Sequence, residues 1–94
     1  MAEKPKAVTL PGGPKVSDTI ARAQWAEAEG YSDAWFGDGG APDALTLAAI
    51  LGDHTERLRV GIAVTPVYTR APSVLAATAY TVAQQLPGRF VMGL

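Results

Sequence analysis

The chain has 94 residues, of which 48% are hydrophobic and 18% charged, and this supply of apolar side chains argues against general disorder. Eight Lys and Arg against nine Asp and Glu give a net charge of −1 with no basic stripe, so we expect no nucleic-acid partner. The absence of cysteine excludes disulfides, and no apolar run approaches the roughly 18 residues of a membrane span, so we expect a cytoplasmic protein with no membrane partner.

The first unit of the chain is a strand followed by a helix. The strand is predicted over residues 6–10, where a short β-compatible run is stopped by "PGGP". The helix is predicted from Ser17, with Ser17 or Asp18 as its N-cap and with Gly30 as the residue just past its end. The charges of Glu27 and Glu29 near its end are expected to be solvated or to pair within the helix.

The second unit repeats this order. The run "YSDAWFGDGG" predicts a strand through residues 34–36 that is broken by glycines. Asp43 can then cap the helix "ALTLAAILGDHT", whose predicted apolar stripe includes Leu45, Ala48 and Gly52.

The last segments continue the alternation. A third strand is predicted in "LRVGIAVT", and Pro72 opens the helix "PSVLAATAYTVAQQL", in which Leu75, Ala79, Val82 and Leu86 share one face. The final "RFVMGL" predicts a fourth strand.

The fold class predicted from this order is α/β, a βαβαβαβ parallel sheet in a single unit spanning residues 1–94. A doubly wound, flavodoxin-like sheet is the alternative, but three helices in simple succession favour winding on one side. The strand-to-helix loops hold most of the Gly, Pro and reactive polar residues, so function is expected at the C-terminal ends of the strands.

Three segments resemble the N-terminal part of the bacterial luciferase-like family of flavin- or deazaflavin (F420)-dependent oxidoreductases, which are TIM barrels. They are "AEAEGYSDAWFGD", "TERLRVGIAVTPVYTRAP" and "LPGRFVMGL". The marks of the resemblance are Ala26, Glu27, Gly30 and Tyr31 at a helix end, Arg70 and Pro72 in Arg-x-Pro, and Gly88, Arg89, Phe90 and Gly93 in Gly-Arg-Phe…Gly.

The resemblance implies that residues 1–94 are the incomplete N-terminal half, strands one to four, of a (β/α)₈ barrel that needs roughly 250 residues. On this interpretation the chain is inactive alone and belongs to an enzyme that acts on a small-molecule substrate. The alternative is a non-catalytic, self-associating α/β half-barrel or scaffold. Both interpretations predict a homo-oligomer, because the two outer strands lack neighbours.

The cofactor implied by the resemblance is FMN or F420, bound by the complete enzyme and not by this chain alone. Asp38 would be the catalytic residue and would also contact the cofactor, since relatives carry an acidic residue here near the ring or substrate, often followed by His. In this chain Gly39 takes the place of that His. An Asx turn in a glycine-rich loop is the alternative role of Asp38.

The other cofactor-binding residues implied by the resemblance are Ala63, Val64, Thr65 and Arg70. Relatives in the F420 branch have a non-prolyl cis peptide that backs the ring, and the corresponding bond is Ala63–Val64; an ordinary buried strand is the alternative. In "VYTRAP", Arg70 could meet an anionic cofactor tail, pair with Asp38 or Asp43, or simply pack at the start of its helix. No metal is expected, because His54 is the only histidine and has no soft partner ligand.

Overall fold

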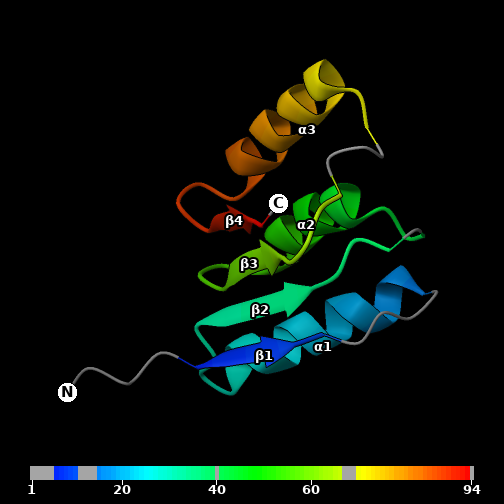
Figure 1. Cartoon of the computed structure of the whole chain (residues 1–94). Helices are drawn as coiled ribbons and strands as arrows, with labels where there is room; N and C mark the ends of the chain where they lie inside the picture. Colours follow the sequence, from blue (N-terminus) through cyan, green and yellow to red (C-terminus); the bar gives the residue numbers. More distant parts are fainter. Residues whose placement is uncertain (1–5, 11–14, 40, 67–69, 94) are drawn as a thin grey trace.

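Strands and helices alternate along the whole described chain. The structure is a computed structural model, and it describes residues 6–10, 15–39, 41–66 and 70–93. Its elements are β1 (Ala7–Thr9), α1 (Val16–Ala28), β2 (Asp33–Phe36), α2 (Ala44–His54), β3 (Arg59–Ile62), α3 (Pro72–Gln85) and β4 (Phe90–Met92) (Figure 1). The predicted order βαβαβαβ is therefore confirmed.

The four strands form one parallel sheet in the order β1-β2-β3-β4. The register places Trp35 between Thr9 and Gly61, and Gly61 next to Val91, so one row of residues crosses the sheet. Neighbours in sequence are neighbours in the sheet, which is the strand order of a barrel wall and not of a doubly wound sheet. The fold is thus α/β with the arrangement of the first four strands of a TIM barrel.

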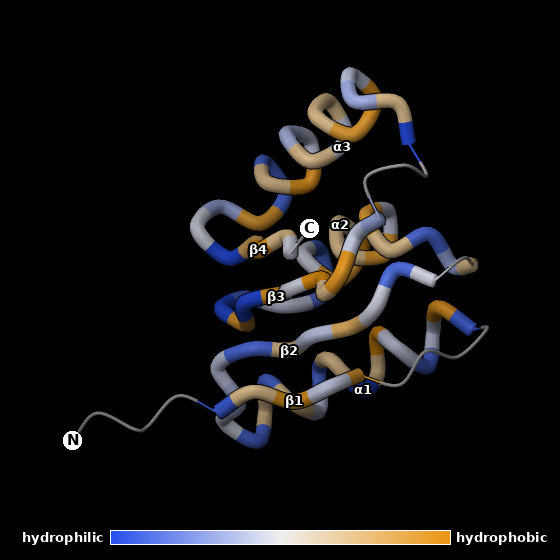
Figure 2. The backbone as a smooth tube through the Cα atoms, viewed as in Figure 1, coloured by the Kyte–Doolittle hydropathy of each residue, from blue (hydrophilic) through white to orange (hydrophobic). Residues whose placement is uncertain are grey.

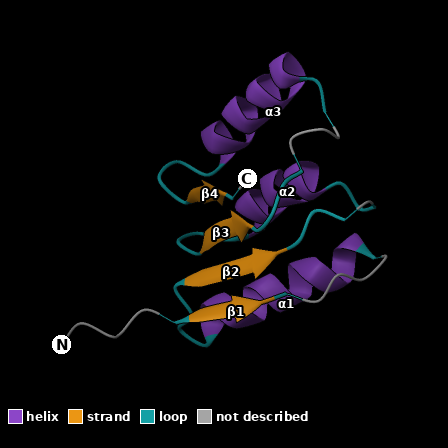
Figure 3. Cartoon of the chain, in the orientation of Figure 1, coloured by secondary structure: helices purple, strands orange, loops and turns teal. Residues whose placement is uncertain are grey.

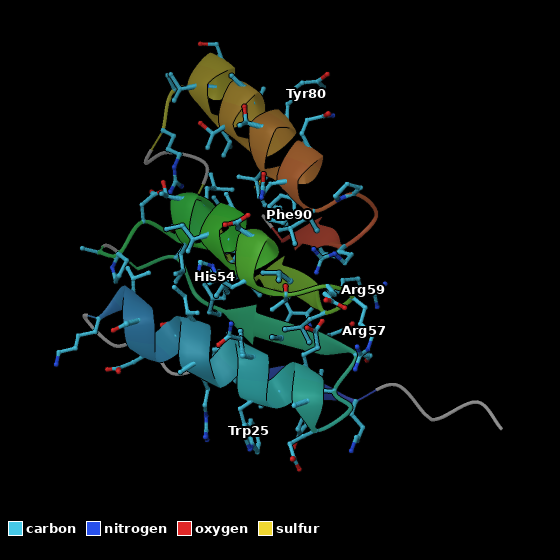
Figure 4. The ribbon with its side chains drawn as sticks, turned by 180° about the vertical axis from the view of Figure 1, so that it is seen from behind. Trp25, His54, Arg57, Arg59, Tyr80 and Phe90 are labelled. Atoms are coloured by element: carbon cyan, nitrogen blue, oxygen red, sulfur yellow. The ribbon has the colours of Figure 1, made fainter. Side chains whose placement is uncertain are left out.

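Helices cover only one face of this sheet. α1 and α2 lie behind the strands in Figure 1 and in front of them in Figure 4, where the molecule is turned by 180°. Alternate residues of β2 and β3, and Leu10 just after β1, point toward the helices and are buried in the core; the strand residues are Ala34, Phe36, Val60 and Ile62. The helices add the buried Ala23, Leu45, Leu51 and Val82, and the buried Leu86 follows directly after α3. In Figure 2 this core appears as the hydrophobic colouring of α2 and β3.

The opposite face of the sheet carries the remaining strand residues, and none of the helices in the described ranges packs on it. Trp35 is half-buried and lies across Gly61, where an added Cβ would come within 2.5 Å of the indole ring. At the N-terminal end of the strands Arg59 forms a two-pronged ion pair with Asp33, with N–O distances of 3.0 and 3.1 Å. We call this surface, which carries Thr9, Trp35, Gly61 and Val91, the uncovered face.

The end of α1 agrees with the prediction from the sequence, but its start does not. Gly30 has a φ of 88°, and the N–H groups of Gly30 and Tyr31 donate to the carbonyls of Glu27 and Ala26. This pair of bonds is a Schellman cap, which requires a residue in the left-handed region, and glycine enters it at the least cost. At the other end the N-cap is Lys15, with no side-chain cap hydrogen bond, so the prediction of Ser17 or Asp18 was wrong.

The close packing of α2 on α3 depends on Gly52. A Cβ at this position would lie 2.7 Å from Cγ of Leu86 and 3.0 Å from the carbonyl oxygen of Gln85. The glycine therefore lets the fully buried Leu86 reach the surface of α2. Among the described residues, no helix has the length and apolar character that crossing a membrane requires.

Candidate functional site at the C-terminal ends of the strands

Three charged side chains from successive loops meet at the C-terminal ends of the strands. Asp38 comes two residues after β2, Asp43 directly precedes α2, and Arg70 comes two residues before α3. The arrowheads of β2 and β3 point to this side in Figure 3, and the loops that lead into the helices leave from it. The parallel sheet therefore gathers side chains that are 27 and 32 residues apart in sequence. We call Asp38, Asp43 and Arg70 the acidic–arginine cluster.

Arg70 joins both carboxylates of this cluster. Its Nη1 donates to Oδ2 of Asp38 at 2.7 Å, and its Nη2 donates to Oδ1 of Asp43 at 2.5 Å. A longer bond of 3.4 Å joins Nη2 to the second oxygen of Asp38, so that both oxygens of Asp38 accept from the guanidinium. The side chains of Arg70 and Asp38 are only 14% and 6% exposed, against 46% for Asp43. Such charge-assisted, forked bonds hold the planes of both groups in place.

Asp43 takes part in the acidic–arginine cluster and also caps α2. Its Oδ2 accepts from the backbone N–H of Thr46 at 3.0 Å and from the Thr46 hydroxyl at 2.8 Å, which makes it the predicted N-cap of α2. Burial raises the pKa of Asp43, but the bonds from Thr46 and Arg70 outweigh burial and hold that pKa below its ordinary value. The hydrogen bonds to Asp38 and Asp43 in turn raise the pKa of Arg70, so this guanidinium stays charged.

Beside this cluster the backbone after β3 presents an apolar surface. The Ala63–Val64 peptide bond is cis, as expected from the resemblance. The N–H of Ala63 donates to the carbonyl of Phe36 at 3.0 Å, which ties the segment to the end of β2. Ala63 is exposed and the Val64 side chain is 57% exposed, an unusual place for a valine in an otherwise buried strand end.

Thr65 continues this segment into the interior. Its backbone N–H donates to the carbonyl of Gly93 at 2.7 Å, and Gly93 donates back to Ile62 at 2.7 Å, so the ends of β3 and β4 are joined. The Thr65 residue is fully buried, and within the described residues its hydroxyl is the one buried side-chain polar atom that lacks a hydrogen-bond partner. Buried hydroxyls normally have a partner, so this group has a hydrogen-bonding capacity that no described residue uses.

The predicted site residues thus lie at one end of the sheet. Asp38 and Arg70 are in direct contact, whereas Ala63, Val64 and Thr65 form the neighbouring backbone segment at the end of β3. Residues 67–69, which include Tyr68 and Thr69 of "VYTRAP", lie outside the described residues, as does the "PGGP" turn. His54 ends α2 with its Nδ1 2.9 Å from the carbonyl of Ile50, and no three His, Cys, Asp or Glu side chains in the described ranges group as a metal site.

Sequence reasoning missed two charged side chains that support this architecture from the other end of the strands. Glu27 is not a solvated or helix-paired charge, because its carboxylate accepts from the backbone N–H groups of residues 56–58. Arg89 donates to Thr55 Oγ1 at 3.0 Å and to the carbonyl of Leu58 at 2.9 Å, just beyond the end of α2. The only signal for either was its place in the motifs "AEAEGY" and "GRF".

A one-sided parallel sheet with a polar cluster and an exposed apolar segment at its C-terminal end defines the class of barrel-type α/β proteins. Comparison with known families makes this more specific. The model of the family described as luciferase-like monooxygenase matches residues 2–94, and the chain belongs to this family.

A curated relative supports the same assignment. Over 62 residues the chain is 42% identical to an F420-dependent glucose-6-phosphate dehydrogenase of Microbacterium testaceum (strain StLB037). The match covers 64% of this chain and 18% of the length of that relative, so the chain corresponds to a small part of it.

Proposed function

We propose that this chain forms the N-terminal part of an F420-dependent oxidoreductase that acts on a small-molecule substrate. The observation that carries the proposal is the juxtaposition, at the C-terminal ends of parallel strands, of a buried carboxylate and an exposed apolar backbone segment. The named dependence of the relative on F420 favours this cofactor, and FMN is the second candidate. The lack of cysteine suits a reducing compartment, the cytoplasm.

The residues present fit a flat, isoalloxazine-type ring. Val64 and the small side chain of Ala63 offer an exposed apolar surface, the Asp38 carboxylate is a hydrogen-bond acceptor, and the Thr65 hydroxyl is an unused donor. A bound deazaflavin would supply hydride transfer at its C5 atom, and the protein would supply binding and orientation. In this arrangement Asp38 is the proposed catalytic residue, which accepts a hydrogen bond from the ring or the substrate, while Ala63, Val64 and Thr65 bind the cofactor.

The chain alone offers only part of such a site, so we expect it to bind F420 or FMN weakly, with no turnover. Nuclear magnetic resonance titration of the labelled chain with each cofactor tests this expectation. Signals of Asp38, Ala63, Val64 and Thr65 should shift, and those of Trp25, on the far side of α1 in Figure 4, should not. Tight binding with a defined stoichiometry would contradict the proposed incompleteness, and shifts confined to other residues would contradict the proposed site.

A chimera tests the catalytic part of the proposal. In it, the matching segment of the Microbacterium testaceum dehydrogenase is replaced by the corresponding residues of this chain. We expect the folded chimera to bind F420 and to reduce it, and Asp38→Ala to lower kcat at least about tenfold, or about 1.4 kcal/mol in the barrier. Exposed Asp53 provides the control Asp53→Ala. Full activity of the Asp38→Ala chimera would assign Asp38 to structure.

A second candidate function, a self-associating α/β scaffold, is favoured by the uncovered face of the sheet. Within the described residues, β1 and β4 each pair with one neighbouring strand only. Open edges and half-covered sheets favour association, and we therefore propose a homo-oligomer for this chain in isolation.

A further inference from the structure

Arg70 could serve the proposed site in two different ways. A cationic side chain at the mouth of a barrel can bind an anionic part of a ligand, such as a phosphate, or it can hold another protein side chain in place. The two roles make different demands on the guanidinium. A ligand-binding arginine needs accessible, unoccupied donors, whereas a positioning arginine has its donors occupied by protein acceptors.

The contacts of Arg70 correspond to the second case. Both terminal nitrogens already donate to carboxylates, Nη1 to Asp38 and Nη2 to Asp38 and Asp43. The side chain is 14% exposed. An anionic group that approached these two nitrogens would compete with carboxylates held by charge-assisted bonds, and it would meet two negative charges beside one positive charge.

The same contacts restrict Asp38. Its carboxylate is 6% exposed and accepts from Arg70 through both oxygens, and Arg70 is itself held by Asp43, the N-cap of α2. The position of the Asp38 carboxylate is therefore fixed, through Arg70, by the start of α2. The two bonds from Arg70 hold the Asp38 carboxylate in one orientation and leave it further lone pairs that can accept hydrogen bonds.

We propose that Arg70 is a positioning residue, which fixes Asp38 as a hydrogen-bond acceptor in the site and is closed to the anionic groups of a cofactor or substrate. This inference rests on the proposed function, because that function makes the cluster part of a ligand site. The contacts that it invokes, however, all lie within this chain. It implies that any phosphate or carboxylate of a bound cofactor is recognised by other residues.

The closed state of Arg70 is tested by titrating the isotope-labelled chain with inorganic phosphate while the side-chain N–H signals of Arg70 are followed. A site of about 1 mM affinity would be nearly saturated at about 10 mM phosphate. We expect no saturable shift of the Arg70 signals in the wild-type chain. In the double variant Asp38→Asn/Asp43→Asn, in which the competing charges are removed, we expect a saturable shift. Saturation in the wild-type chain would overturn the proposal. This wild-type measurement does not depend on whether the double variant folds.

The positioning role is tested by the side-chain carboxyl ¹³C signal of Asp38. We expect this signal to move in Arg70→Lys and to move further in Arg70→Gln, because lysine keeps the charge but cannot form the forked bond. The signal of Asp18, in the exposed first turn of α1, should stay in place in both variants. An unchanged Asp38 signal in either folded variant would overturn the proposal. Since neither arm uses a cofactor, failure to bind F420 or FMN would contradict the proposed function and leave these results valid.

Discussion

The carboxylate of Glu27, at the end of α1, lies 2.7 Å from the backbone nitrogen of Leu58, directly before β3. The backbone N–H groups of Glu56 and Arg57 donate to the same carboxylate, at 3.1 and 2.7 Å. One side chain thus satisfies three consecutive backbone donors of the α2–β3 connection. Burial raises the pKa of Glu27, but these bonds, together with the charge of Arg57, outweigh burial and hold the pKa below its ordinary value of 4.5.

We predict that Glu27→Gln lowers the free energy of unfolding by about 1–2 kcal/mol at neutral pH. The reason is that glutamine offers a single uncharged oxygen to the three backbone donors, whereas the carboxylate offers two charged oxygens. The wild-type stabilisation is present above the unfolded-state pKa of about 4.5, and it is lost as the pH falls from there through the lower folded-state pKa. Urea unfolding at several pH values measures both effects. Glu29→Gln, which changes an exposed side chain of the same helix end, is the control. An equal pH dependence in wild type and Glu27→Gln would contradict the prediction.

Gly52→Ala should destabilise the protein, although alanine is the better helix former by about 1 kcal/mol. The new methyl group would lie 2.7 Å from Leu86 Cγ and 3.0 Å from the carbonyl oxygen of Gln85, so the Leu86 side chain must shift or α2 and α3 must separate. Overpacking of this kind costs about 1–3 kcal/mol, which exceeds the gain in helix propensity. Thermal unfolding of Gly52→Ala, Leu86→Val and the double variant measures the coupling. If the clash is the cause, the double variant should be more stable than the two single changes predict when added. Simple additivity would contradict this explanation.

Arg89→Lys should also destabilise the protein, by about 1–3 kcal/mol. The half-buried guanidinium donates to the carbonyl oxygens of Gly52 and Leu58 and to Thr55 Oγ1. A single ammonium group cannot reach all three acceptors. Chemical denaturation gives the difference. The matched change Arg22→Lys, at an exposed position of α1 where the guanidinium lies over Trp25, should cost less than half as much. Equal losses in the two variants would remove the special role of Arg89.

The uncovered face should mediate self-association. Val91 lies in the row with Trp35 and Gly61 on this face, so Val91→Lys places a charge where a second copy would pack. Light scattering should show a higher oligomer for the wild-type chain and a larger monomer fraction for Val91→Lys. Val74→Lys, on the exposed side of α3, should leave the distribution unchanged. A cooperatively folding 9.8 kDa wild-type monomer would contradict the expected assembly.

Much of the fold could be predicted because it depends on local patterns. Gly30 and Asp43 are helix-end signals whose partners lie within a few residues, and both act as predicted. The apolar spacing of "PSVLAATAYTVAQQL" identified Val82 and Leu86, which are buried. The predicted N-cap of α1 was wrong because the cap position lies two residues before Ser17, at a lysine whose side chain makes no capping hydrogen bond and therefore gives no local signal.

The candidate site was only partly predictable, because its contacts join distant residues. The sequence pattern suggested that Arg70 could pair with Asp38 or with Asp43, but it could not show that both pairs form at once. Likewise, the donors that surround Glu27 come from residues 29 to 31 positions away, and no periodicity of α1 indicates them. Pairings of this kind are set by the register of the sheet and by the direction in which each helix returns.

The acidic–arginine cluster has a consequence for folding during synthesis. Its three members are separated by 27 and 32 residues, and all of them precede α3. Domains generally fold as units during synthesis. Asp38 and Asp43 are synthesised before Arg70, so the emerging chain first carries both carboxylates without the cation that pairs with them in the fold.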